Sequence, residues 1–176
     1  MFTIRNPETP RHVAGQLARL ALIVSLVLAI LGLALPALAA PASVTTAQLQ
    51  ANHQNELNWL QYQTGHLTRA NQLAVLMQTY VNTQNSANKN YGDLVSALAN
   101  YNAQLASAQS AHNAAAGILQ TAAGFDANGN VTSFVQAHQT VRTARQSLWD
   151  CHRTLRQAAF DVSVAIHNYR QANPGS

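Results

Sequence analysis

The feature that most constrains the fold of this chain is a double seven-residue repeat near its C-terminus. One row holds large residues, at Phe134, Val141, Leu148, Leu155, Val162 and Tyr169. The second row holds small ones, at Ala137, Ala144, Cys151, Ala158, Ala165 and Ala172. The rows alternate at spacings of three and four, which places both on one face of a helix. Large residues facing small ones are typical of closely spaced antiparallel helices, so the repeat predicts a helix over about 132–172.

Two earlier segments also have helical spacing, over about 46–82 and 94–122. The apolar stripe of the first comprises Trp59, Leu60, Leu67, Ala70, Leu73, Ala74, Met77, Tyr80 and Val81. The second repeats every seven residues, in the rows Leu94, Tyr101, Ala108, Ala115, Ala122 and Leu98, Leu105, His112, Leu119. His112 thus falls on an apolar seam, where we expect a histidine at the core edge with one nitrogen bonded; a ligand role is the alternative.

Clusters of turn-forming residues over 82–92 and 124–130 separate these segments. We expect Asp93 to cap the second helix, and Thr132 or Ser133 to cap the third. Short connections make neighbouring helices antiparallel. The predicted fold is therefore all-α, an elongated antiparallel three-helix bundle or coiled coil over 43–176. Because an Ala-rich core buries little apolar surface, a homodimer is also compatible with this pattern.

Residues 1–42 have the layout of a secretory signal. Arg5, Arg11 and Arg19 precede the apolar run 20–35, and Pro36 and a small-residue segment follow it. Cleavage after Ala39 or Ala42 fits this layout; the alternative is a retained N-terminal membrane anchor that tethers the chain. Both interpretations predict an exported protein that is periplasmic, on the cell surface or secreted.

Charge and cysteine content narrow the partners. Only 9% of residues are charged, and the net charge is +4. The segment beyond residue 42 contains seven basic and five acidic residues. This excess of positive charge is too small for nucleic acid to be expected as a partner. The single cysteine, Cys151, has no partner for an intramolecular disulfide. Because it occupies an Ala position, we expect a small buried residue; intermolecular pairing or reactivity is the alternative.

Metal and cofactor motifs are each incomplete. Six histidines follow the N-terminal segment, at His53, His66, His112, His138, His152 and His167. None stands four residues from another histidine or an acid, so we expect polar helix surfaces and no metal or cofactor, with weak metal binding as the alternative. The loop 126–130 begins like a calcium site, but Val131 and Ala137 stand where Gly and a bidentate Glu are needed. A haem attachment motif before His152 would need a cysteine where Leu148 stands.

One stripe on the third helix is the candidate binding face. It comprises His138, Arg142, Arg145, Trp149, His152 and Arg156, at spacings of three and four. Arginine beside tryptophan can stack on a ring or bind an anion. The alternative is a flank that shields the seam and forms ion pairs across helices. The sequence contains no paired carboxylates on one predicted face, no phosphate loop and no nucleophile elbow, so we do not expect an enzyme.

The segment Val44-Thr-Thr-Ala-Gln48 resembles the Leu-Thr-x-x-Gln motif of small periplasmic helical stress chaperones. The similarity covers five residues and implies a periplasmic, metal- or stress-responsive chaperone as an alternative function. The principal hypothesis is an exported, non-catalytic helical protein of the cell envelope. It would be structural, or would bind an unknown protein or envelope component.

Overall fold

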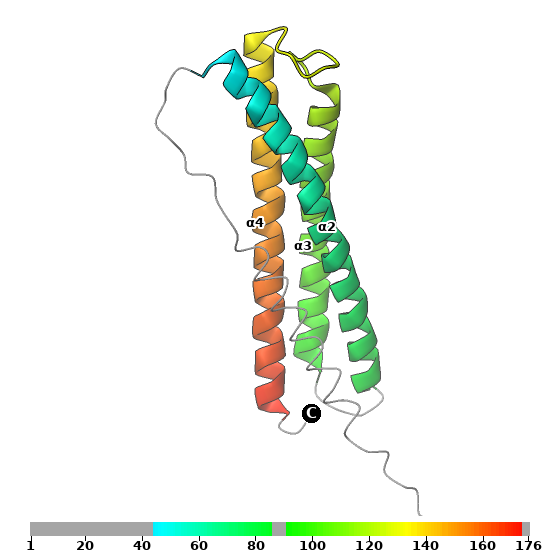
Figure 1. The fold of residues 1–176 in the computed structure, drawn as a ribbon. Helices are drawn as coiled ribbons and strands as arrows, with labels where there is room; N and C mark the ends of the chain where they lie inside the picture. The colour runs from blue at the N-terminus through cyan, green and yellow to red at the C-terminus, as the bar shows by residue number, and fades with distance from the viewer. Residues whose placement is uncertain (1–43, 86–90, 174–176) are drawn as a thin grey trace, which may run out of the picture.

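The computed structural model describes residues 44–85 and 91–173, and these form three helices (Figure 1). They are α2 (Thr46–Asn85), α3 (Gly92–Thr121) and α4 (Phe134–Ala172). At 1.5 Å per residue the longest is about 60 Å long. Within the described ranges there is no strand, and a single isolated bridge pairs Phe125 with Val131. The predicted all-helical class is therefore confirmed, and the predicted helix bounds lie within three residues of those observed.

The three helices are arranged as a bundle in which α3 and α4 lie antiparallel and make the most extensive contact (Figure 1). Helix α2 packs on both at a visible angle, beginning near α4 and ending beside α3. Its first turns contact the α3–α4 loop, where Gln50 Nε2 donates a 3.2 Å hydrogen bond to Asn130 Oδ1. A stack of His53 on Phe125, with 4.2 Å between ring centroids, adds to this contact.

The start of α2 is fixed by a reciprocal capping box. The backbone N–H of Gln48 donates to Thr45 Oγ1 at 3.2 Å, and the backbone N–H of Thr45 donates to Gln48 Oε1 at 2.8 Å. Each side chain thus satisfies a backbone donor that the first helical turn leaves unpaired. The Thr-x-x-Gln segment that resembled a chaperone motif is therefore accounted for by helix capping.

The other two helix starts differ from each other. Helix α3 begins at Gly92 with Tyr91 at the cap position, so the prediction that Asp93 caps it is wrong. Asp93 lies inside the first turn, where a carboxylate still favours the positive end of the helix dipole. Ser133 does precede α4 as expected, with extended backbone, although its side chain makes no capping hydrogen bond.

The α3–α4 loop is a compact connector organised by Asp126. Its carboxylate accepts hydrogen bonds from the backbone N–H groups of Asn128 and Asn130, at 2.9 and 2.8 Å. The side-chain amide of Asn130 donates a third at 3.0 Å, and these bonds hold the pKa of Asp126 below its usual value. The loop thus uses its carboxylate for its own backbone, as in a helix-connecting turn.

The buried faces of α3 and α4 follow the predicted seven-residue repeats over most of each helix. In α3 the two predicted rows are buried as far as Leu119. In α4 the large row is buried from Val141 onward, but Phe134 is 45% exposed, contrary to expectation. Towards the C-terminus the small row moves by one residue: Ala159 is buried beside Ala158, Ile166 is buried in place of Ala165, and Ala172 is exposed. A helix of 3.6 residues per turn drifts about 20° for every seven residues, which accounts for the shift.

None of α2, α3 and α4 is long and apolar enough to span a membrane. The predicted signal or anchor over residues 1–42 lies outside the residues that the structure describes.

Candidate functional site

The first half of α2 turns a polar face toward the bundle interior. His53, Glu56, Gln63 and His66 are each at least nine-tenths buried. Their spacings of three, seven and three continue the buried stripe of Leu67 backward along the helix. The expectation that His53 and His66 lie on a polar surface is therefore wrong, because the buried stripe of α2 is itself polar at this end of the helix.

Glu56 is neutralised from α4. Arg145 Nε donates to Glu56 Oε1 at 2.7 Å, and the glutamate side chain is 4% exposed against 38% for the arginine. Burial raises the pKa of Glu56, and the bond to Arg145 opposes that rise. Arg145, predicted as part of a binding face, is instead the internal partner of a buried acid.

Two further polar contacts join the helices in this region. Gln63 Nε2 donates to the carbonyl oxygen of Leu148 at 2.8 Å. His112 Nε2 lies 3.1 Å from Thr64 Oγ1 and 3.3 Å from the carbonyl oxygen of Leu60. Its Nδ1 is buried without a partner among the described residues. His112 is thus the core-edge histidine with one satisfied nitrogen that the sequence predicted.

Aromatic rings pack beside this polar region. Trp59 of α2 meets Trp149 of α4 edge-on, with 5.7 Å between ring centroids. His152 lies 5.9 Å from Trp149 and 6.4 Å from Trp59, so all three rings form one group. Since the rings come from two helices, they hold Trp149 and His152 in defined positions on the surface of α4.

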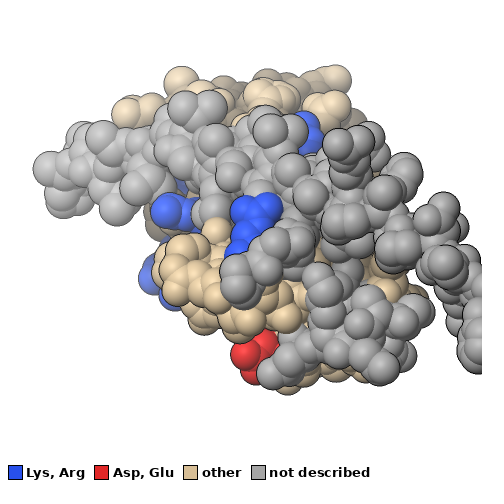
Figure 2. Space-filling view, turned by 90° about the horizontal axis from the view of Figure 1, so that it is seen from below, with Lys and Arg blue, Asp and Glu red and all other residues tan. Residues whose placement is uncertain are grey.

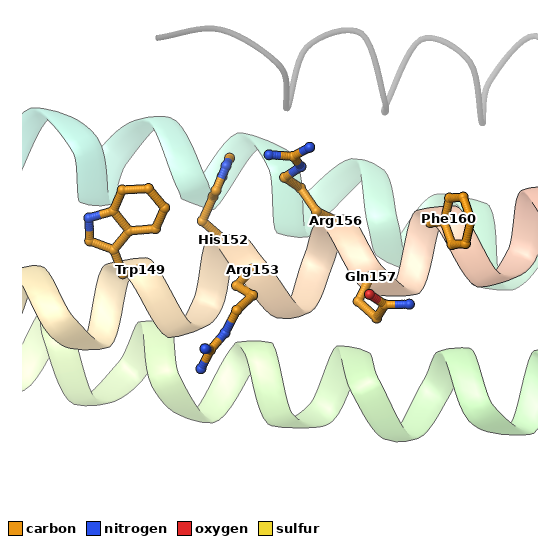
Figure 3. Close-up of a pocket in the computed structure, with 6 residues that line it drawn as sticks. All are labelled: Trp149, His152, Arg153, Arg156, Gln157 and Phe160. Carbon is orange, nitrogen blue, oxygen red and sulfur yellow. The ribbon is translucent and has the colours of Figure 1, made fainter. Parts of the chain in front are cut away.

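A surface depression of about 330 Å³, here called the α4 hollow, begins at these rings. It is lined by Trp149, His152, Arg153, Arg156, Gln157 and Phe160. In Figure 3, Trp149, His152 and Arg156 extend from α4 toward the side of α2, while Arg153 and Gln157 extend toward the side of α3. The hollow therefore lies along α4 with a ring or a cation at each of its positions except Gln157.

The cations at the hollow are not equivalent. Arg153 Nη2 donates to Asp150 at 2.8 Å, and Gln157 Nε2 donates to Asp161 at 2.8 Å. Arg156, by contrast, makes no ion pair with any acid in the described part of the chain. It is exposed and is the cation of the hollow whose charge no neighbouring carboxylate neutralises.

The charges of Arg69 of α2 and Arg156 of α4 each affect the pKa of a nearby histidine. Burial lowers the pKa of His66, and the charges of Arg69 and His152 lower it further. Burial also lowers the pKa of His152, and the charge of Arg156 adds to this effect. The permanent charges that act on these histidines are those of Arg69 and Arg156, one from each helix, and the lowered pKa values leave both imidazoles neutral near pH 7. Figure 2, seen from below, shows basic side chains at several places among the described residues in view.

The structure divides the six residues predicted as a binding face. Trp149, His152 and Arg156 meet at the α4 hollow. Arg145 is paired internally, while His138 and Arg142 are exposed nearer the start of α4 and do not line the hollow. Sequence reasoning missed the contribution of α2, although Arg69 and His66 share a face at a spacing of three.

The remaining candidate groups are arranged for packing. Within the described ranges no three His, Cys, Asp or Glu side chains gather in a way that could hold a metal ion. Cys151 is fully buried, as predicted, and burial raises the pKa of its thiol to about 12. The α4 hollow, by contrast, can hold an anion at Arg156 and an apolar group against Trp149 and Phe160.

No protein-family model matches this chain, and comparisons with curated proteins and with solved structures gave no significant match.

Proposed function

We propose that this chain is an exported, non-catalytic helical protein of the cell envelope that binds a partner through the α4 hollow. The observation that carries the proposal is that one hollow is lined by Arg156, which has no acidic partner among the described residues, and by the rings of Trp149 and the exposed Phe160. An arginine beside aromatic rings on a rigid helix is the composition of an interaction surface.

The acidic side chains support a binding role over catalysis. Glu56 is paired with Arg145, and Asp150 with Arg153. Asp161 accepts hydrogen bonds from Gln104 and Gln157, both at 2.8 Å, and Asp126 is bound within its loop. These carboxylates stabilise the fold, so they are poorly placed to act as general acids or bases.

Export is tested by measuring the N-terminus of the protein recovered from a Gram-negative host after fractionation. A periplasmic or secreted product that begins at Ala40 or Ser43 supports the proposal with a cleaved signal. A membrane-bound product that retains residue 1 supports it with an anchor. Full-length protein that remains in the cytoplasmic fraction contradicts it.

Partner binding is tested by photo-crosslinking in the same cells. A photoreactive amino acid replaces Gln157 in one variant and Arg142 in the other, both exposed positions on α4, and the first lines the hollow while leaving Arg156 in place. We expect a discrete adduct from position 157 that is absent at position 142. Equal adducts from both positions, or none from position 157, would overturn the assignment of the binding face.

A further inference from the structure

We propose that the α4 hollow binds a small amphiphile, a molecule that carries one phosphate or carboxylate group on an apolar body. This inference deepens the proposed function by naming the class of ligand for the same surface. It requires two adjoining regions of opposite character, and the hollow provides both.

The anionic group is accommodated at the α2-facing side of the hollow. Arg156 has no acidic partner there among the described residues, and His152 lies one turn before it on the same face. Arg69 of α2 is exposed and adds a second guanidinium near this side, as its electrostatic effect on His66, which His152 also affects, indicates. His66 itself is buried, and its lowered pKa leaves the imidazole neutral. Because guanidinium groups bind phosphate and carboxylate oxygens in a bidentate manner, an oxyanion is the complementary charge.

The apolar body is accommodated along α4. Trp149 closes one end of the hollow and Phe160 the other, and Phe160 is 56% exposed. Val164, one turn beyond Phe160, is 42% exposed and continues the apolar surface. An aromatic side chain that is this exposed leaves apolar surface in contact with water. An alkyl or aromatic ligand would cover that surface.

The size and shape of the hollow favour a single small molecule over a flat membrane surface. Its volume of about 330 Å³ is at the lower end of the range for ligand sites. The lining side chains Trp149, His152 and Arg156 extend to one side of α4 and Arg153 and Gln157 to the other (Figure 3), and the hollow lies along the helix among them.

The test uses the full-length chain and dodecyl phosphate, added below its critical micelle concentration, with tryptophan fluorescence as the readout. Trp149 lines the hollow and Trp59 packs against Trp149. Binding at the hollow therefore alters the tryptophan fluorescence emission directly. We expect a saturable change with dodecyl phosphate and none with dodecyltrimethylammonium, which has the same chain and the opposite charge. Inorganic phosphate alone should bind at least about tenfold more weakly, because it lacks the apolar body.

Variants assign the two regions. Arg156→Gln should weaken dodecyl phosphate binding by about tenfold, and Arg69→Gln should weaken it by a smaller factor. Phe160→Ser should weaken dodecyl phosphate but leave inorganic phosphate unchanged. The matched control is Arg142→Gln, an exposed arginine of the same helix outside the hollow, which should bind within about twofold of the parent.

Several results would overturn the inference. Equal binding of the anionic and cationic surfactants would show that only the chain is recognised. Equal affinity for inorganic and dodecyl phosphate would remove the apolar region, and an unchanged Arg156→Gln would remove the cationic one. Binding to anionic phospholipid vesicles without binding of monomeric dodecyl phosphate would indicate a membrane surface instead. If crosslinking from position 157 succeeds while dodecyl phosphate fails, the binding face stands and only its ligand class is wrong.

Discussion

Arg145 of α4 donates a 2.7 Å hydrogen bond to Glu56 of α2, and this bond neutralises an almost fully buried carboxylate. Replacing Arg145 with Met retains much of the alkyl chain and leaves Glu56 without its partner. We expect a loss of about 2 kcal/mol in the free energy of unfolding at pH 8. The estimate is below the range for fully buried pairs because Arg145 is partly exposed.

The loss should shrink as the pH falls. The pKa of Glu56 is already raised by burial, and removing Arg145 raises it further, so protonation relieves the cost in acid. Urea denaturation at pH 8 and pH 5 measures the difference. Arg142→Met changes an exposed arginine and is the control. It should leave the free energy of unfolding unchanged. The double variant Glu56→Leu with Arg145→Met should recover most of the stability, and a double variant as unstable as Arg145→Met would contradict this account.

The two glycines of the α3–α4 loop are expected to differ in their tolerance of a side chain. Gly124 has a φ of +87°, and a Cβ there would collide with the backbone nitrogen of Ala137 and lie 2.7 Å from the carbonyl oxygen of Ser133. Gly129 has a φ of +80°, but a Cβ there meets open space. Gly129→Ala should therefore cost about 1 kcal/mol, the usual strain of left-handed backbone. Gly124→Ala should cost about 3 kcal/mol or more, because the start of α4 must also move. Thermal unfolding of both variants measures the difference, and equal losses would show that the contact with α4 is unimportant.

Cys151 should be unreactive in the folded protein. Its side chain is fully buried and the raised pKa of about 12 disfavours the thiolate that attacks disulfide reagents. We expect negligible labelling by 5,5′-dithiobis(2-nitrobenzoate) at pH 8 over minutes, and rapid stoichiometric labelling in 6 M guanidinium. Rapid labelling without denaturant would mean that the buried face of α4 around Cys151 opens readily.

Acidification should destabilise the bundle through three histidines. Burial lowers the pKa values of His53, His66 and His152 below the unfolded value of 6.5. Below pH 6.5 the unfolded chain therefore binds more protons than the folded one, so stability falls as the pH drops toward the folded pKa values. Glu56 changes in the opposite direction, since its raised pKa favours the folded state in acid, and it partly offsets the loss.

Urea denaturation at intervals between pH 8 and pH 5 measures this dependence. His66→Gln should flatten the profile, because Gln does not titrate. The exposed His138 is the control position, and His138→Gln should leave the slope unchanged. A parent profile that is flat over this range would show that these histidines do not determine the acid stability.

The local pattern of the sequence determined the three helices. The repeats in α3 and α4 set their buried faces because side chains three and four residues apart share a face in any α-helix. Clusters of turn-forming residues determined where the helices stop, since backbone preference there is local. The burial of Cys151 and the position of His112 followed from the same rule, because each occupies a place in a seven-residue row.

Other properties depend on how helices pack against each other, and only the tertiary structure decided them. The polar stripe of α2 is buried because α4 presents Arg145 to Glu56 and the carbonyl oxygen of Leu148 to Gln63. No rule of spacing within one helix reveals a partner 80 or more residues away. For the same reason the sequence placed Arg145 and Arg156 on one binding face, whereas contacts with α2 neutralise Arg145 inside the bundle and leave Arg156 at the α4 hollow.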